Sequence, residues 1–125
     1  MIIEKLKIRE KQVIAHEMAH KSVGGPYTGA VHYTYTYGPD GKRYISGGEV
    51  SIDVSPEGDP EETIRKMQIV RAAALAPVDP SPQDLAVAQR ATAIEMKAKM
   101  ELMQKTYRQS QTATSKESIK FNVIV

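Results

Sequence analysis

The segment HEMAH, residues 16–20, places two histidines four positions apart, with a glutamate directly after the first. Side chains four apart on a helix project from the same face, so His16 and His20 can reach a common point. Their imidazole nitrogens are ligands that Zn²⁺ prefers, and a helix holds such a pair rigidly. Glu17 stands where a carboxylate can take a proton from water on the metal and return it to a leaving amine. The motif therefore predicts a zinc hydrolase site, with His16 and His20 as metal ligands and Glu17 as the catalytic residue.

A catalytic zinc needs a third protein ligand, and the sequence offers three candidates. Cysteine is absent, so this ligand must be an imidazole or a carboxylate. Glu49 ranks first, because the glycine pair at 47–48 can bring its strand close to the helix. His32 is the better zinc donor by type, but it shares a predicted strand face with two threonines, and that face is expected to meet solvent. Asp53 ranks third, since an aspartate at the end of a strand commonly forms a turn.

Stabilisation of an oxyanion would require a hydrogen-bond donor near the metal. Tyr44, Tyr27 and His32 are the candidates for this role. Tyrosines are also favoured in strands for their packing, so packing is the expected role of each tyrosine taken alone.

The elements that position these residues begin with a helix, predicted from Ile3 to Val23 and ended by Gly-Gly-Pro at 24–26. A β-hairpin is predicted from Val31 to Asp53, because tyrosines and threonines alternate before a Gly-Pro-Asp-Gly turn. Its return strand is predicted over residues 42–45, followed by an interruption, with a bulge or a close backbone approach at the glycine pair.

Two further helices have clear start signals, DPEE at 59–62 and SPQD at 81–84, both with proline at the first helical position. The first helix is predicted from Pro60 to about Ala76, and the second, long one from Pro82 to Arg108. Residues at helical spacing give the long helix an apolar stripe that extends beyond a small core: Met96, Met100, Met103 and Tyr107. This stripe predicts a partner helix, with a homodimer as the simplest arrangement.

The chain length of 125 residues predicts one domain with one core. We assign residues 1–108 to the metallopeptidase domain and residues 109–125 to a tail. The polar stretch 109–118 is predicted to be a linker, and residues 119–125 a short apolar strand that can add to a sheet edge near the metal.

Composition and charge exclude several classes of protein. The net charge of +2 comes from 17 basic and 15 acidic residues of interspersed sign, which does not indicate nucleic-acid binding. No signal peptide and no stretch of roughly 20 apolar residues is recognisable. A cytoplasmic protein with no membrane partner is therefore expected.

With these residues in place, the sequence resembles the SprA-related family of bacterial zinc metalloproteases. The resemblance is carried by VIAHEMAH, GGPYTGAVHYTYTYGPDGKRYISGGEVSID, GDPEETIRKMQIVRAAALAP and PSPQDLAVAQRA, and it covers roughly residues 6–94. It implies a metalloprotease in which the motif residues are His16, Glu17 and His20, and it places Glu49 in the GGEV segment.

The sequence thus predicts an α+β, zincin-like minimal domain: a metal-bearing helix, a β-hairpin and two further helices, the last one long. The predicted function is Zn²⁺-dependent hydrolysis of peptide bonds in a peptide or protein substrate. The alternative is a non-catalytic interaction module, with a structural metal or histidine site and a Met-rich dimerisation helix. A fourth protein ligand would indicate the structural site, and an open coordination position the catalytic one.

Overall fold

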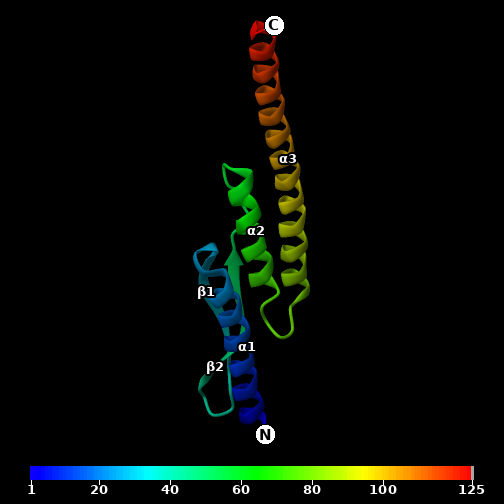
Figure 1. Cartoon of the computed structure of the whole chain (residues 1–125). Helices are drawn as coiled ribbons and strands as arrows, with labels where there is room; N and C mark the ends of the chain where they lie inside the picture. Colours follow the sequence, from blue (N-terminus) through cyan, green and yellow to red (C-terminus); the bar gives the residue numbers. More distant parts are fainter. Residues whose placement is uncertain (125) are drawn as a thin grey trace.

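The computed structural model describes the backbone of residues 1–124 and the side chains of residues 1–112. In chain order the elements are α1 (Ile2–Gly24), the short 3-10 helix η1 (Gly25–Tyr27), β1 (Thr28–Tyr37), β2 (Arg43–Ile52), α2 (Pro60–Ala74) and α3 (Pro82–Ile124). Helix α1 packs on the hairpin, mainly on β2, and α2 packs against both α1 and α3 (Figure 1). The predicted α+β architecture and its order of elements are confirmed.

Helix α1 ends where the glycines predicted it would end. Gly25 has a positive φ of 52°, which a residue with a side chain would rarely adopt, and Pro26 starts η1. Four residues of α1 are buried, at spacings of four, three and four: Val13, Glu17, His20 and Gly24. Two members of this buried stripe are polar, so the face that a helix normally uses for apolar packing carries the residues of the motif.

The two strands form an antiparallel sheet, with a turn at Gly38–Gly41 as predicted. Strand β2 does not stop at Ile45, as the sequence analysis expected, but continues through the glycine pair to Ile52. The register shifts where Thr34 pairs with Gly47 and Tyr35 with Ile45, which leaves Ser46 as the extra residue of a β-bulge. The bulge absorbs the irregularity that the glycine pair indicated, so the strand is bent and not broken.

The apolar core lies between α2 and α3. Met67, Val70 and Ala91 are fully buried at its centre. Around them pack partly buried apolar side chains from η1, the end of β2, the loop after it and α3: Tyr27, Ile52, Val54, Val87 and Ile94. Small residues of the two helices allow a close approach, so the core fixes where α3 begins relative to α2.

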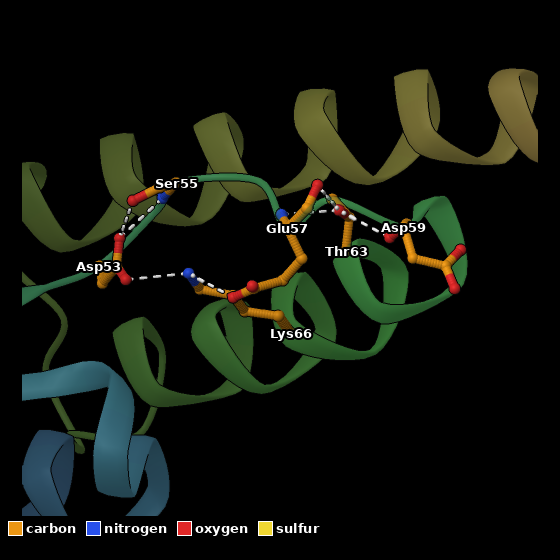
Figure 2. Close-up of polar contacts among 6 residues, drawn as sticks. All are labelled: Asp53, Ser55, Glu57, Asp59, Thr63 and Lys66. Carbon is orange, nitrogen blue, oxygen red and sulfur yellow. Dashed lines mark hydrogen bonds and ion pairs between the residues drawn. The ribbon is translucent and has the colours of Figure 1, made fainter.

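A buried lysine ties the segment after β2 to α2 (Figure 2). The Lys66 side chain is 3% exposed, and its Nζ lies 2.9 Å from Asp53 Oδ2 and 3.1 Å from Glu57 Oε1. At the start of α2, Asp59 accepts a hydrogen bond from the Glu61 backbone N–H, as the predicted cap requires. We call Lys66, Asp53 and Glu57 the lysine clamp.

Helix α3 is longer than predicted, with 43 residues or about 65 Å. It continues through residues 109–124, where the sequence analysis expected a linker and then a strand at the sheet edge, and it projects beyond the end of α2 (Figure 1). This stretch contains neither glycine nor proline, so no residue in it strongly opposes the continuation of a helix already in progress. Val125, the last residue of the predicted strand, lies outside the described residues.

Candidate metal centre

The two histidines of α1 converge, as the motif predicted. His20 is 2% exposed and His16 is half-buried, and their Nε2 atoms lie 3.3 Å apart. The two rings meet edge to face, with an interplanar angle of 80°. The spacing of four residues therefore brings two imidazole nitrogens close together, as in a metal-binding helix.

The orientation of the His20 ring is fixed by α2. Its Nδ1 lies 2.7 Å from the carbonyl oxygen of Ala73, in the last turn of α2. A carbonyl can only accept, so Nδ1 carries the hydrogen, and in the neutral ring Nε2 then presents a lone pair to the site. Gly24 makes this approach possible, because a Cβ at that position would lie 3.1 Å from the Cβ of Ala73 and 2.4 Å from the Thr28 side chain. A hydrogen bond of this kind is the usual support of a metal-binding histidine.

The third donor is Asp84, from the first turn of α3. One carboxylate oxygen lies 3.1 Å from His16 Nε2 and the other 3.1 Å from His20 Nε2. Among the side chains of residues 1–112, His16, His20 and Asp84 are the one group of three possible metal ligands whose donor atoms gather within 4.8 Å. The structure therefore brings an aspartate, 64 positions after His20, to the pair of histidines.

A capping box holds Asp84 in place. The Asp84 backbone N–H donates to Ser81 Oγ at 3.0 Å, and the Ser81 backbone N–H donates to Asp84 Oδ2 at 2.9 Å. The sequence analysis identified this capping box but not the second role of its carboxylate. The signal that could have identified Asp84 as a donor is its side-chain type. A capping box holds the carboxylate at a fixed position in the first turn of a helix, and a carboxylate can accept further interactions beyond the one from the cap.

The donor set fits a zinc ion by chemistry and by spacing. Bond lengths of 2.0–2.1 Å in a tetrahedral site imply ligand atoms about 3.3 Å apart. The two Nε2 atoms are 3.3 Å apart, close to that value, and each lies 3.1 Å from a different oxygen of the Asp84 carboxylate. Between a carboxylate oxygen and the lone pair of His20 Nε2 the interaction is repulsive unless a cation or a proton lies between them. Two imidazoles and one carboxylate are also a common ligand set for catalytic zinc.

Glu17 is buried beside this group with one oxygen unpartnered. The residue is 5% exposed, and its Oε2 has no hydrogen-bond partner among the described residues. Burial raises the pKa of Glu17, the nearby His16 and His20 oppose that shift, and the negative charges of Asp84 and Glu49 add to it. A carboxylate with a raised pKa and a free oxygen is suited to accept and return a proton.

Strand β2 presses directly on Glu17 at the second glycine of the pair. A Cβ at Gly48 would lie 3.1 Å from Glu17 Cγ, 3.1 Å from the Tyr33 ring and 3.3 Å from Val13. A side chain would therefore force α1 and β2 apart. The sequence analysis expected a close backbone approach here, and Gly48 makes it.

A cleft of about 820 Å³ opens over His16 and Glu17. One wall is the exposed face of α1, another is the glycine pair of β2, and the third is the connection from α2 to α3 at residues 76–82. That connection contains three prolines, at positions 77, 80 and 82, which restrict its backbone. His16 and Glu17 therefore line an open cleft, and the backbone of one of its walls is restricted by prolines.

The three predicted candidates for the third ligand lie elsewhere. Glu49 and His32 face each other across the two strands, and both are exposed. Glu49 is close enough to contribute to the raised pKa of Glu17, but its carboxylate does not join the donor group. Asp53 belongs to the lysine clamp.

The candidate oxyanion donors are occupied or distant. Tyr44 is buried and donates to Asp40 in the hairpin turn, and Tyr27 packs on the core with Lys66 over its ring. Neither tyrosine lines the cleft, and nor does His32. Three polar cleft residues were not singled out from the sequence: Gln12 and Arg9, one and two turns before His16 on α1, and Asp79 in the connection to α3.

A sequence profile of the SprA-related family matches residues 1–121. The chain belongs to the SprA-related family. No curated protein and no solved structure matches the chain. The matched range includes His16, His20 and Asp84 and almost all of α3.

No helix in residues 1–124 combines the length and the apolar character needed to cross a membrane.

Proposed function

We propose that this protein is a zinc-dependent peptidase. In this proposal His16, His20 and Asp84 hold the metal and Glu17 is the general base and then the general acid. The observation that carries it is the gathering of two imidazoles and the Asp84 carboxylate beside a buried carboxylate with a free oxygen, where His16 and Glu17 line an open cleft. When bound, Zn²⁺ supplies Lewis acidity, polarising a carbonyl and acidifying water.

The work of the chain's own residues follows from their surroundings. The free oxygen of Glu17 accepts a proton from a water molecule in the cleft. Because burial raises the pKa of this carboxyl, the proton is then available for the leaving nitrogen of the peptide. The Ala73 carbonyl and the Ser81 backbone N–H fix the two ligands that they contact, so the donor set is preorganised.

The number of donors favours catalysis over a structural metal. Structural zinc sites are closed by four protein ligands, whereas catalytic sites use three and leave a position for water or substrate. Within the side chains that the structure describes, three donors gather at the site, and His16 is still half-exposed toward the cleft. An extended peptide can reach that exposed side through the opening between α1, the glycine pair and the proline-rich connection.

The decisive experiment separates metal binding from chemistry. Calorimetric titration with Zn²⁺ should give one site per chain in the wild type and in Glu17→Gln, and no site in His20→Ala. Hydrolysis of a quenched fluorescent casein should require Zn²⁺ and should fall about 10³-fold in Glu17→Gln, in the range expected for loss of a general acid-base. The proposal is overturned if the wild type binds no zinc, or if Glu17→Gln cleaves as fast as the wild type.

A second candidate function rests on α3. Met96, Met100, Met103 and Tyr107 are each more than 60% exposed and follow one another at spacings of four, three and four. This is the spacing of a coiled-coil seam. We propose that two copies of the chain pair through this stripe. Sedimentation equilibrium should give a dimer for the wild type and a monomer for a Met100→Glu, Met103→Glu double variant. A monomeric wild type at about 100 times the assay concentration would contradict the pairing.

A further inference from the structure

Three cleft residues form a row along α1 that the motif does not explain. Arg9, Gln12 and His16 lie at positions i, i+3 and i+7, which places them on one face of the helix, and all three line the cleft. Seven residues of helix correspond to about 10 Å. The row therefore has a cation at one end, an amide in the middle and a candidate metal ligand at the other end.

Arg9 is held at its place by the bulge of β2. Its Nε donates to the backbone carbonyl of Ser46 at 3.3 Å, and on the next residue Glu10 Oε2 accepts from the Ile45 backbone N–H at 2.8 Å. A bulge leaves backbone groups without ladder partners, and α1 supplies partners for two of them. The hydrogen bond orients the guanidinium group but uses one of its five N–H donors.

The rest of the Arg9 guanidinium has no partner among the described side chains. Within residues 1–112 no carboxylate lies within ion-pair distance of it. The seven ion pairs of this region involve six other basic residues: His16, His20, Lys66, Arg71, Lys99 and Lys105. Asp79 on the opposite wall of the cleft does not reach it. Arg9 is thus an oriented cation that faces a cleft and has no counter-ion.

We infer that Arg9 binds a carboxylate of the substrate and so selects acidic peptides. This inference rests on the proposed function. An extended peptide advances about 3.3 Å per residue, so the 10 Å between Arg9 and His16 places the carboxylate roughly three residues from the bond that is cleaved. The amide of Gln12, between them, can donate to and accept from the intervening peptide backbone. The carboxylate can belong to an Asp or Glu side chain or to the free C-terminus of a short peptide.

Binding to the zinc-loaded Glu17→Gln protein tests this without relying on turnover. The probes are fluorescein-labelled, alanine-based nonapeptides in which one Asp, or one Asn at the same position, is moved along the chain. A second set carries no acidic side chain and ends in either a free carboxylate or an amide. We expect Asp to bind about tenfold more tightly than Asn at one or two adjacent positions, as for a partly exposed charge-assisted hydrogen bond. A preference for the free terminus alone would identify the C-terminal carboxylate as the ligand.

Two variants assign the preference to Arg9. Arg9→Gln should reduce the Asp-to-Asn ratio to about one, and Arg9→Glu should reverse it in favour of Lys at the same position. Lys7→Gln removes the same charge from an exposed position of α1 that does not line the cleft, and it should leave the ratio unchanged. Thermal unfolding of each variant reports separately on loss of the Ser46 contact.

The outcomes distinguish this inference from the proposed function. The role of Arg9 is overturned if Asp and Asn peptides bind equally and the free-carboxylate and amide peptides also bind equally, if neither set binds detectably, or if the preference survives Arg9→Gln. If the preference is found and depends on Arg9, but the wild type hydrolyses none of the peptides, carboxylate recognition stands and the peptidase proposal fails.

Discussion

The lysine clamp and the candidate metal centre both bury charged side chains against α2, but they balance those charges differently. In the clamp, Lys66 is enclosed and two half-exposed carboxylates meet its ammonium group (Figure 2). At the metal centre three donors face one another, and Glu17 beside them keeps an oxygen without a partner. Every charge of the clamp is compensated within the chain, whereas the charges of the centre are not.

This difference separates a structural polar cluster from a functional one. An uncompensated buried carboxylate costs stability, and a fold retains it where it serves another purpose. The clamp does not require any further component, because both of its carboxylates are partly hydrated and its cation is paired. In the proposed function a cation would complete the centre. Helix α2 contributes to both sites, and residues of the centre line a cleft whereas those of the clamp do not.

Removing the clamp's lysine should give the largest change in stability. In Lys66→Ala the clamp loses its cation and a buried stem, so we expect the free energy of unfolding to fall by about 3 kcal/mol. Lys66→Met keeps the volume of the stem and should cost less than about 1 kcal/mol, since an apolar isostere commonly replaces a buried ion pair without loss. Urea denaturation of both variants measures this. Equal losses in the two variants would show that the charge, and not the packing, dominates.

Changing an acid to its amide should have opposite effects at the two sites. Asp53→Asn leaves Lys66 with one carboxylate and should cost about 1–2 kcal/mol, less than for a fully buried pair because Asp53 is half-exposed. Glu17→Gln removes an unpaired buried charge and should leave the metal-free protein as stable as before or more stable by up to about 1 kcal/mol. Denaturation in EDTA compares them. A Glu17→Gln protein less stable than Asp53→Asn would contradict the contrast between the sites.

Glycine-to-alanine changes compare the backbones of the two regions. Gly48→Ala places a methyl group against Glu17, Tyr33 and Val13, and should cost about 1–2 kcal/mol and lower the affinity for Zn²⁺. Gly58, in the loop of the clamp, has open space around it and no positive φ, so Gly58→Ala should be neutral or should stabilise by about 0.5 kcal/mol. Thermal unfolding with and without Zn²⁺ tests both, and a harmless Gly48→Ala would argue against close contact between β2 and α1.

The smallest expected effect is a pH dependence confined to the clamp. Hydrogen bonds from Ser55 and then from Lys66 hold the pKa of Asp53 below its usual range. Its contribution to stability is therefore complete above the unfolded-state pKa of about 3.9 and is lost as the pH falls below that value. Between about pH 4 and pH 2 the stability of Asp53→Asn should fall less steeply than that of the wild type. Parallel curves for the two proteins would remove Asp53 from the acid-sensitive groups.

Local sequence signals predicted the local structure well. The glycines at 24 and 25, the hairpin turn, the Asp59 N-cap and the capping box at Ser81 and Asp84 each act within a few residues, and the structure has all of them. The convergence of His16 and His20 is also local, because it depends on one helical turn. The predicted end of the long helix at Arg108 was wrong. A polar composition alone cannot end a helix, and no glycine or proline follows Pro82.

The identity of the third donor could not be predicted in this way. Asp84 reaches the histidines because α3 packs on α2, and α2 packs on α1, so its position depends on two tertiary interfaces. Glu49 was favoured by its neighbouring glycines, and those glycines do bring β2 onto α1, but Gly48 and not Glu49 makes the contact. The four-residue spacing of His16 and His20 predicts how these two side chains lie relative to each other. Which further residue joins them depends on how the helices pack, and the spacing does not determine that packing.

Because the Ser81 and Asp84 capping box is also part of the candidate metal centre, we expect metal binding and the stability of the start of α3 to be linked. An ion bound to the Asp84 carboxylate would also stabilise the first turn of α3 and the proline-rich segment before it, which is a wall of the cleft. Loading with metal should therefore slow amide hydrogen exchange in residues 81–88, at a distance from either histidine in the sequence. In the proposed function, the cleft would then become fully ordered when zinc binds, and removal of zinc would increase the mobility of its proline-rich wall first.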